Sequence, residues 1–120
     1  MGRRILVIDD DATILDLIRA VLLEEGHDVD VALNGAEALA KDSRPPEVCV
    51  LDMFLPGISG PDLVTALRDK FGQDLPILLT SASIVEREAE QLGAYEYLPK
   101  PFDLEELLGA VRRGLDGSSS

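Results

Sequence analysis

The sequence has little cysteine, little positive charge and no long apolar run, and each shortage excludes a class of protein. Cys49 is the only cysteine among the 120 residues, so an internal disulfide cannot form. It lies in the apolar run 48–51, where a thiol behaves as a small hydrophobic side chain. A chain without disulfides suits a reducing compartment, and we predict a cytoplasmic location.

Positive charge is scarce throughout the chain. There are 11 Lys and Arg against 23 Asp and Glu, a formal net charge of −12 at pH 7. A surface of this sign repels phosphate backbones and anionic lipids, so we expect no direct nucleic-acid partner and no membrane partner. No apolar run approaches the ~18 residues of a membrane-spanning helix. The apolar segment 5–8 is too short, and is followed by too many acids, for a signal peptide.

What the chain does contain is a regular alternation of apolar segments. Its length fits one domain, and 46% hydrophobic residues are enough for a buried core. Strand-like runs alternate with segments of helical periodicity, which predicts an α/β fold: a doubly wound, five-stranded parallel sheet with five helices on its two faces. The more polar second strand is expected at an edge. The predicted strands are 4–9, 28–33, 48–52, 76–80 and 95–98, and the predicted helices are 12–25, 36–42, 61–71, 84–92 and 104–115.

Acidic residues gather where the predicted strands end. Asp9, Asp10 and Asp11 follow the first strand and Asp52 closes the third, and such ends meet at one edge of a parallel sheet. Asp11 is interpreted as a helix cap. The other three carboxylates, within ~5 Å of one another, would repel by roughly 3 kcal/mol per pair at an effective dielectric near 20, which favours a cation between them. Oxygen ligands favour Mg²⁺ over Zn²⁺, and His27 is interpreted as a surface residue.

Two further polar residues are expected at the same edge. Thr80 ends the fourth strand, and Lys100 follows the fifth between Pro99 and Pro101, where backbone freedom is low. A cation, an ammonium group and a hydroxyl together suit a phosphoryl group, and a carboxylate can act as its nucleophile. The sequence therefore predicts aspartyl-phosphate chemistry.

Four stretches in order carry a resemblance to a known family. They are ILVIDDD at 5–11, VLDMFLPGISG at 50–60, LTSA at 79–82 and YLPKPF at 97–102. With these, the chain resembles the receiver domain of two-component response regulators over almost its whole length. The resemblance implies a flavodoxin-like strand order 2-1-3-4-5. We expect the receiver domain to span residues 3–116, with residues 117–120 forming a flexible linker stub or a tag remnant.

The resemblance also implies roles at the acidic edge. Asp52 would be the phosphoacceptor. Asp10 and Asp52 would ligate Mg²⁺ directly together with the backbone carbonyl of Phe54, Asp9 would act through water, and Mn²⁺ would be an acceptable substitute. Phe54 and Ala82 stand at positions that influence the lifetime of the aspartyl phosphate in this family.

The resemblance further implies roles in a conformational change that follows phosphorylation. Lys100 would pair with the phosphate, Thr80 would be drawn toward it, and Tyr97 would turn inward into the vacated space. Apart from the resemblance, the favoured interpretation of Tyr97 is a half-buried strand aromatic. The peptide bond between Lys100 and Pro101 is expected to be cis.

Two pairs of residues carry open alternatives. Ser81 stands where the family often has the smaller Ala or Gly, and Ser59 stands where Asp is common. Neither difference removes a chemical role, although the larger Ser81 narrows access to the phosphate. Arg112 and Arg113, late in the last helix, either contribute positive charge to an interaction surface or complement the helix dipole.

The predicted function is a phosphorylation-controlled switch rather than a multiple-turnover enzyme. The implied partners are a sensor histidine kinase or phosphotransfer protein, an output domain or effector, and a second copy of the chain on activation. The alternative is a phosphorylation-independent interaction module with the same fold. A phosphohydrolase is disfavoured because Phe54 stands where a second catalytic Asp would be needed. Only self-phosphorylation from phosphodonors and slow self-dephosphorylation are expected.

Overall fold

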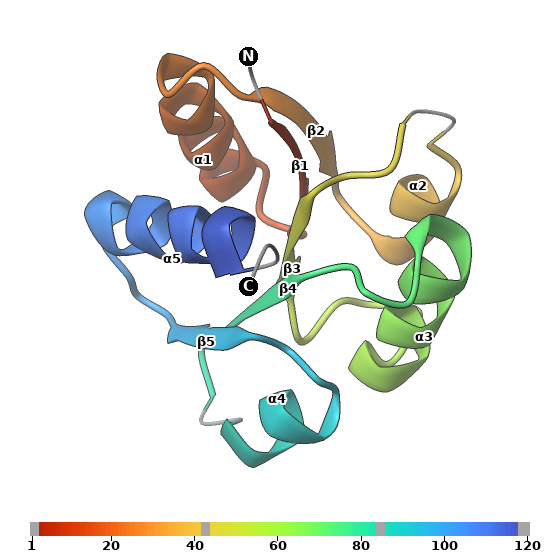
Figure 1. The fold of residues 1–120 in the computed structure, drawn as a ribbon. Coiled ribbons are helices and arrows are strands. Elements are labelled where there is room, and N and C mark those ends of the chain that lie inside the picture. Colours follow the sequence, from red (N-terminus) through yellow and green to blue (C-terminus); the bar gives the residue numbers. More distant parts are fainter. Residues whose placement is uncertain (1–2, 42–43, 84–85, 118–120) are drawn as a thin grey trace.

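The computed structural model describes residues 3–41, 44–83 and 86–117. In these ranges five strands alternate with five helices along the chain, as the sequence predicts (Figure 1). The elements are β1 (Arg4–Ile8), α1 (Ala12–Glu24), β2 (Asp28–Ala32), α2 (Gly35–Leu39), β3 (Val48–Asp52), α3 (Gly60–Phe71), β4 (Ile77–Ser81), α4 (Glu86–Gln91), β5 (Glu96–Pro99) and α5 (Leu104–Gly117).

The strands form one parallel sheet in the order β2-β1-β3-β4-β5. The predicted doubly wound fold and its strand order are thus confirmed, with the more polar β2 at an edge. Both β3 and β4 lie inside the sheet, and all their residues are buried. Such strands are covered on both faces, which explains their continuous apolar sequences.

Two apolar clusters fill the two sides of the sheet. Helices α1 and α5 cover one face, and α2, α3 and α4 cover the other (Figure 1). Successive strand residues point to opposite faces, so Leu6 and Ile8 of β1 join the cluster under α3 while Ile5 and Val7 join the cluster under α1 and α5. Because both faces are covered by helices, the carboxyl-terminal edge of the sheet is left for chemistry.

The helix boundaries follow local signals with some corrections. Asp11 caps α1 by accepting hydrogen bonds from the backbone of Thr13 and Ile14, as predicted. Helix α2 ends at Leu39, earlier than predicted. The predicted end of this helix (residue 42), the predicted start of the fourth helix (84–85) and most of the expected tail (118–120) lie outside the described residues. His27 is half-buried rather than at the surface. It precedes β2, at the amino-terminal ends of the strands, whereas the acidic residues lie at the carboxyl-terminal ends.

Among the described residues, no helix is both long enough and apolar enough to cross a membrane.

Cys49 allows a direct test of the core. Complete burial raises the pKa of its thiol to about 12, and the thiolate is the reactive form. At pH 8 we expect the folded protein to react with an aromatic disulfide reagent at least about a hundredfold more slowly than the urea-unfolded protein, as measured by absorbance. Since Cys49 is the only thiol, equal rates would show that β3 is not buried as described.

Candidate functional site

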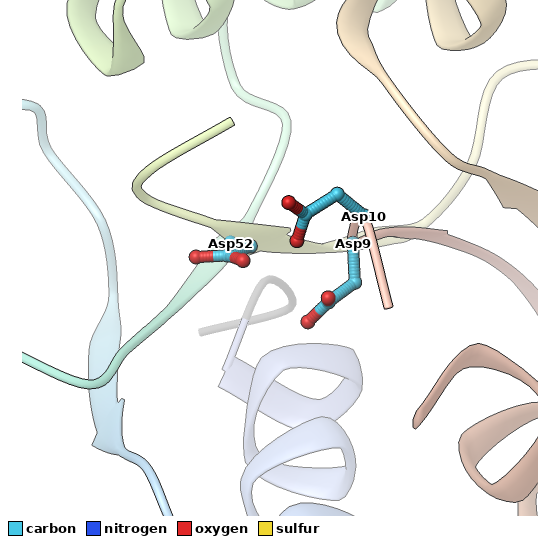
Figure 2. A group of neighbouring side chains, drawn as sticks. All are labelled: Asp9, Asp10 and Asp52. Carbon is cyan, nitrogen blue, oxygen red and sulfur yellow. The ribbon is translucent and has the colours of Figure 1, made fainter. Parts of the chain in front are cut away.

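Three carboxylates meet at the carboxyl-terminal edge of two neighbouring strands. Asp9 and Asp10 follow β1, and Asp52 is the last residue of β3, which pairs with β1. One carboxylate oxygen from each residue lies within 4.8 Å of the other two. Figure 2 shows the three side chains converging from these two strand ends. The structure therefore brings together the three acids that the sequence predicts to be close.

The three acids differ in their exposure to solvent. Asp9 is 3% exposed and Asp52 is 8% exposed, whereas Asp10 is exposed. The Asp9 carboxylate accepts a hydrogen bond from the backbone N–H of Asp11, with 2.9 Å between the nitrogen and Oδ1. This hydrogen bond fixes the buried Asp9 carboxylate, and Asp10 lies on the solvent side of the cluster.

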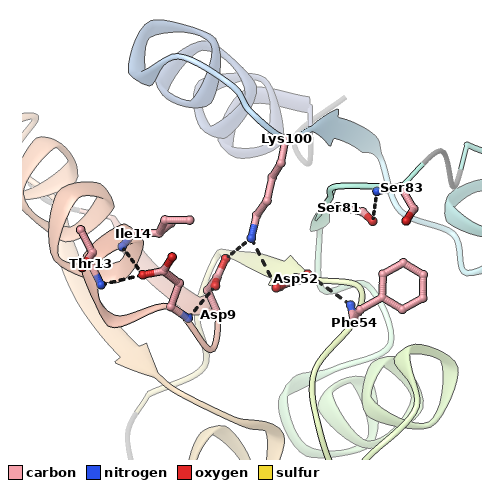
Figure 3. Close-up of polar contacts among 9 residues, drawn as sticks. Asp9, Thr13, Ile14, Asp52, Phe54, Ser81, Ser83 and Lys100 are labelled. Atoms are coloured by element: carbon pink, nitrogen blue, oxygen red, sulfur yellow. Dashed lines mark hydrogen bonds and ion pairs between the residues drawn. The ribbon is translucent and has the colours of Figure 1, made fainter.

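Lys100 supplies the positive charge of the site. Its Nζ atom lies 2.7 Å from Oδ2 of Asp9 and 3.4 Å from Oδ2 of Asp52, and Figure 3 shows the side chain reaching between the two. The Lys100 backbone N–H donates to the carbonyl oxygen of Ser81 at 2.8 Å, and the peptide bond to Pro101 is cis. The ammonium group thus has a defined position, between two carboxylates that would otherwise repel each other.

The pKa values of the site follow from burial and from these charges. Burial raises the pKa of Asp52, and the nearby charge of Asp9 adds to this; the N–H of Phe54, 3.2 Å from Oδ1, and the charge of Lys100 offset part of it. Burial alone would lower the pKa of Lys100, but its hydrogen bonds and ion pairs with Asp9 and Asp52 outweigh this and raise it. Lys100 is therefore protonated at neutral pH.

The remaining predicted residues surround Asp52 on β4 and the loop after β3. Thr80 is buried and is paired with Asp52 in the sheet register, and its carbonyl oxygen accepts from the Met53 N–H at 2.9 Å. Ser81 is also buried, and its hydroxyl accepts from the Ser83 N–H. The Phe54 side chain is 60% exposed, and Figure 3 shows its ring beside Asp52, directed away from the carboxylate cluster.

Tyr97 lies apart from the carboxylates. It is half-buried on β5, and its hydroxyl donates to the carbonyl oxygen of Ser83 at 2.7 Å. Ser83 belongs to the segment that leads from β4 toward α4. The tyrosine therefore contacts the chain three residues beyond Thr80 rather than the acidic cluster itself.

The donor set fits a hard divalent cation. Three carboxylate oxygens within 4.8 Å offer oxygen ligands only, which suits Mg²⁺ or Mn²⁺ better than a metal that prefers nitrogen or sulfur. In the ranges that the structure describes, no other group of three acidic, His or Cys residues is arranged in this way. The two buried carboxylates share one ammonium group, so the cluster retains an excess of negative charge to attract a cation.

Comparison with known proteins agrees with this geometry. The family model described as "Response regulator receiver domain" matches residues 5–112. The chain belongs to this family. It is 44% identical to the response regulator MprA of Mycobacterium tuberculosis over 116 residues, an alignment that covers 93% of this chain and 50% of MprA. It is 43% identical to MprA of Mycobacterium leprae over 113 residues, which cover 91% of this chain and 49% of that protein. The chain spans about half the length of these curated relatives.

Solved receiver structures share the fold along the whole chain. A CheY-like receiver domain protein from Methanospirillum hungatei is 26% identical with a TM-score of 0.89, over 99% of this chain and 98% of that one. The response regulator TrrA from Thermotoga maritima, solved in complex with Mg²⁺–BeF, is 37% identical with a TM-score of 0.81, over 94% and 99% of the two chains. This chain is therefore a receiver domain in fold as well as in sequence.

The arginines of the last helix form ion pairs with neighbouring elements. Arg113 makes a two-point ion pair with Glu96 of β5, at 2.6 and 2.7 Å, and Arg112 pairs with Glu25 after α1. Neither arginine lies in the last turn of α5, so the helix dipole does not explain them. The pairs tie α5 to β5 and to the end of α1, and sequence periodicity contains no signal for such long-range partners.

Proposed function

We propose that this domain is a phosphorylation-controlled switch in which Asp52 accepts a phosphoryl group from the phosphohistidine of a sensor kinase or phosphotransfer protein. The observation that supports this most directly is the position of the Lys100 ammonium, 2.7 Å from Asp9 and 3.4 Å from Asp52 in a cluster of three carboxylates. A purely structural salt bridge would need one carboxylate, whereas a phosphoryl site needs both a cation cluster and a separate positive side chain.

The residues have separate tasks in this proposal. A carboxylate oxygen of Asp52 forms a bond to phosphorus while the bond from phosphorus to the donor's imidazole nitrogen breaks, its electron pair remaining on the nitrogen. Lys100 pairs with the transferred phosphoryl oxygens. Asp10, Asp52 and the Phe54 carbonyl would hold Mg²⁺ directly and Asp9 through water; when bound, the cation supplies positive charge for the phosphoryl oxygens. The similar protein TrrA was solved in complex with Mg²⁺–BeF, which supports cation binding by this fold.

The signal would leave the site through Thr80 and Tyr97. The Thr80 hydroxyl would move toward the phosphoryl group, and Tyr97 would exchange its hydrogen bond with the Ser83 carbonyl for an inward position. Such a rearrangement changes the surface of α4, β5 and α5 that a partner contacts. We place the receiver domain at residues 3–116 in a cytoplasmic protein. Its output is an effector, a further domain or homodimerisation, and it is a phosphoacceptor rather than a multiple-turnover enzyme.

Phosphate incorporation tests the proposal. With Mg²⁺ and a small phosphodonor such as acetyl phosphate, the wild type should gain one phosphoryl group by intact mass, whereas Asp52→Asn should gain none. Asp62→Asn, which removes an exposed carboxylate at the start of α3, should behave as wild type. Chelating the Mg²⁺ should prevent incorporation, and Mn²⁺ should restore it.

Two outcomes would reject the assignment in different ways. Full incorporation by Asp52→Asn would place the phosphoacceptor elsewhere. No incorporation by the wild type, together with no Mg²⁺ binding in a titration, would instead favour an interaction module that works without phosphorylation.

A further inference from the structure

One side chain of α3 is hydrogen-bonded to the backbone immediately after α4. Arg68, in the last part of α3, donates hydrogen bonds from its guanidinium to the carbonyl oxygens of Leu92 (2.5 Å) and Gly93 (3.0 Å). These acceptors lie 24 and 25 residues further along the chain. Both elements cover the same face of the sheet (Figure 1). A single arginine thus binds two successive carbonyl groups immediately after α4.

Helix α4 has few other attachments in the described part of the chain. It is six residues long and Ala89 is its only buried residue, while Leu92 and Ala94 just after it are partly buried against the same core cluster. An alanine side chain buries little apolar surface, so packing contributes little to holding this helix. By contrast, α3 buries Leu63, Val64 and Leu67. Arg68 therefore links a firmly packed helix to a weakly packed one.

The charge of Arg68 suits the position that it occupies. The carboxyl-terminal end of a helix carries a partial negative charge, and α4 has no basic residue in its own last turn. The guanidinium supplies that charge from α3. Gly93 has a φ of +71°, and a Cβ atom at this position would lie 3.4 Å from Nη1 of Arg68, so the glycine allows the turn and the close approach of the arginine at once.

The two ends of α4 are placed differently relative to Asp52. Before α4, the Ser83 carbonyl accepts from the Tyr97 hydroxyl near the carboxyl-terminal edge of the sheet. After α4, Tyr95 donates its backbone N–H to Ile77, the first residue of β4. This end is a strand length away, roughly 13 Å for four residue steps. Phosphorylation would thus perturb the Tyr97 contact directly and leave the Arg68 contact distant from the new charge.

We propose that Arg68 is the fixed attachment point of α4, retained in the unphosphorylated and phosphorylated states, so that displacement of α4 is confined to its amino-terminal end beside Tyr97. The second half of this inference rests on the proposed phosphorylation of Asp52. Arg68 is then a positioning residue, which sets how α4 moves without touching the phosphoryl group.

Hydrogen–deuterium exchange of the unmodified protein tests the attachment. Arg68→Met keeps the apolar stem and removes the guanidinium, and we expect amide exchange in residues 89–95 to rise by about tenfold or more, because hydrogen bonds to a charged group are lost. Arg87→Gln removes an exposed arginine of α4 itself and should leave exchange in 89–95 unchanged. Arg68→Lys, which provides a charge without the planar pair of donors, should give an intermediate rate.

If Arg68→Met does not fold, amide exchange in residues 89–95 of Arg68→Lys still tests the attachment. Exchange in 89–95 that is the same for wild type, Arg68→Lys and Arg87→Gln would overturn the proposal, since two hydrogen bonds from one guanidinium would then have no effect on α4. This part of the experiment uses no phosphodonor, so its outcome is independent of the proposed function.

Phosphorylated protein tests whether the attachment persists. With Mg²⁺ and acetyl phosphate, the wild type should exchange faster in 86–90 but not in 91–95, whereas Arg68→Met should exchange faster in both. Faster exchange in 91–95 of the phosphorylated wild type would overturn the idea of a fixed attachment while leaving the phosphoacceptor assignment intact. A chain that takes up no phosphate would instead contradict the proposed function and the second half of this inference, but not the first measurement.

Discussion

Replacing Lys100 with Met is expected to lower the free energy of unfolding by about 3 kcal/mol in the absence of divalent cations. The substitution keeps an apolar side chain of similar length and removes the ammonium that lies between Asp9 and Asp52. Both carboxylates are nearly buried, and removing one partner of a buried ion pair leaves uncompensated charge in a poorly solvated place. Urea unfolding followed by circular dichroism at pH 7 with a chelator measures the effect.

Lys70→Met is the matched control for this measurement. Lys70 is exposed on α3, with its Nζ atom 5.4 Å from the centre of the Phe71 ring, a contact whose loss should cost about 1 kcal/mol or less. Adding Mg²⁺ should restore part of the stability lost in Lys100→Met, because a cation again lies among the carboxylates, and should leave the Lys70→Met difference unchanged. Equal losses for the two lysine variants would mean that the Lys100 ammonium does not balance the buried acids.

The strands of this fold could be predicted from the sequence because their signals are local. Runs such as 5–8 and 77–79 are continuously apolar, which is typical of parallel strands covered on both faces. Asp11 could be assigned as a helix cap for the same reason, since its partners Thr13 and Ile14 lie only two and three residues further along the chain. Once the strands are known, the alternation with helices requires a parallel sheet, and the shared edge of Asp9, Asp10 and Asp52 follows from it.

Other features depend on tertiary position and could not be predicted. The distance of Lys100 from Asp9 and Asp52 depends on the path of a long flexible side chain, although the flanking prolines indicate a restricted backbone. The partners of Arg68 are 24 and 25 residues away, and nothing in its neighbours distinguishes it from an ordinary surface arginine. The polar sequence around His27 predicts a surface residue, whereas the fold half-buries it.

Asp52→Asn is expected to change stability in the direction opposite to Lys100→Met. In metal-free protein at pH 7, it should raise the free energy of unfolding by about 1–2 kcal/mol, because burial leaves the ionised Asp52 carboxylate poorly solvated and this penalty, with the repulsion by Asp9, outweighs the hydrogen bond from Phe54 and the attraction to Lys100. The pKa of Asp52 is raised chiefly by burial, to which the charge of Asp9 adds, so it has the sign expected of this penalty. A carboxyl whose folded-state pKa lies above its unfolded value destabilises the fold when it is ionised.

The pH dependence of this difference identifies its origin. The penalty is fully present above the raised folded-state pKa of Asp52 and disappears below the unfolded value of about 3.9, so the advantage of Asp52→Asn over wild type should shrink as the pH is lowered from 7 toward 4. Asp62→Asn, at an exposed position, should show no comparable advantage at pH 7. Mg²⁺ should reverse the order, since a cation that binds the native acidic cluster stabilises the wild type by mass action and binds Asp52→Asn more weakly. Were Asp52→Asn less stable than wild type in metal-free buffer, the Asp52 charge would stabilise the fold without a cation, contrary to this prediction.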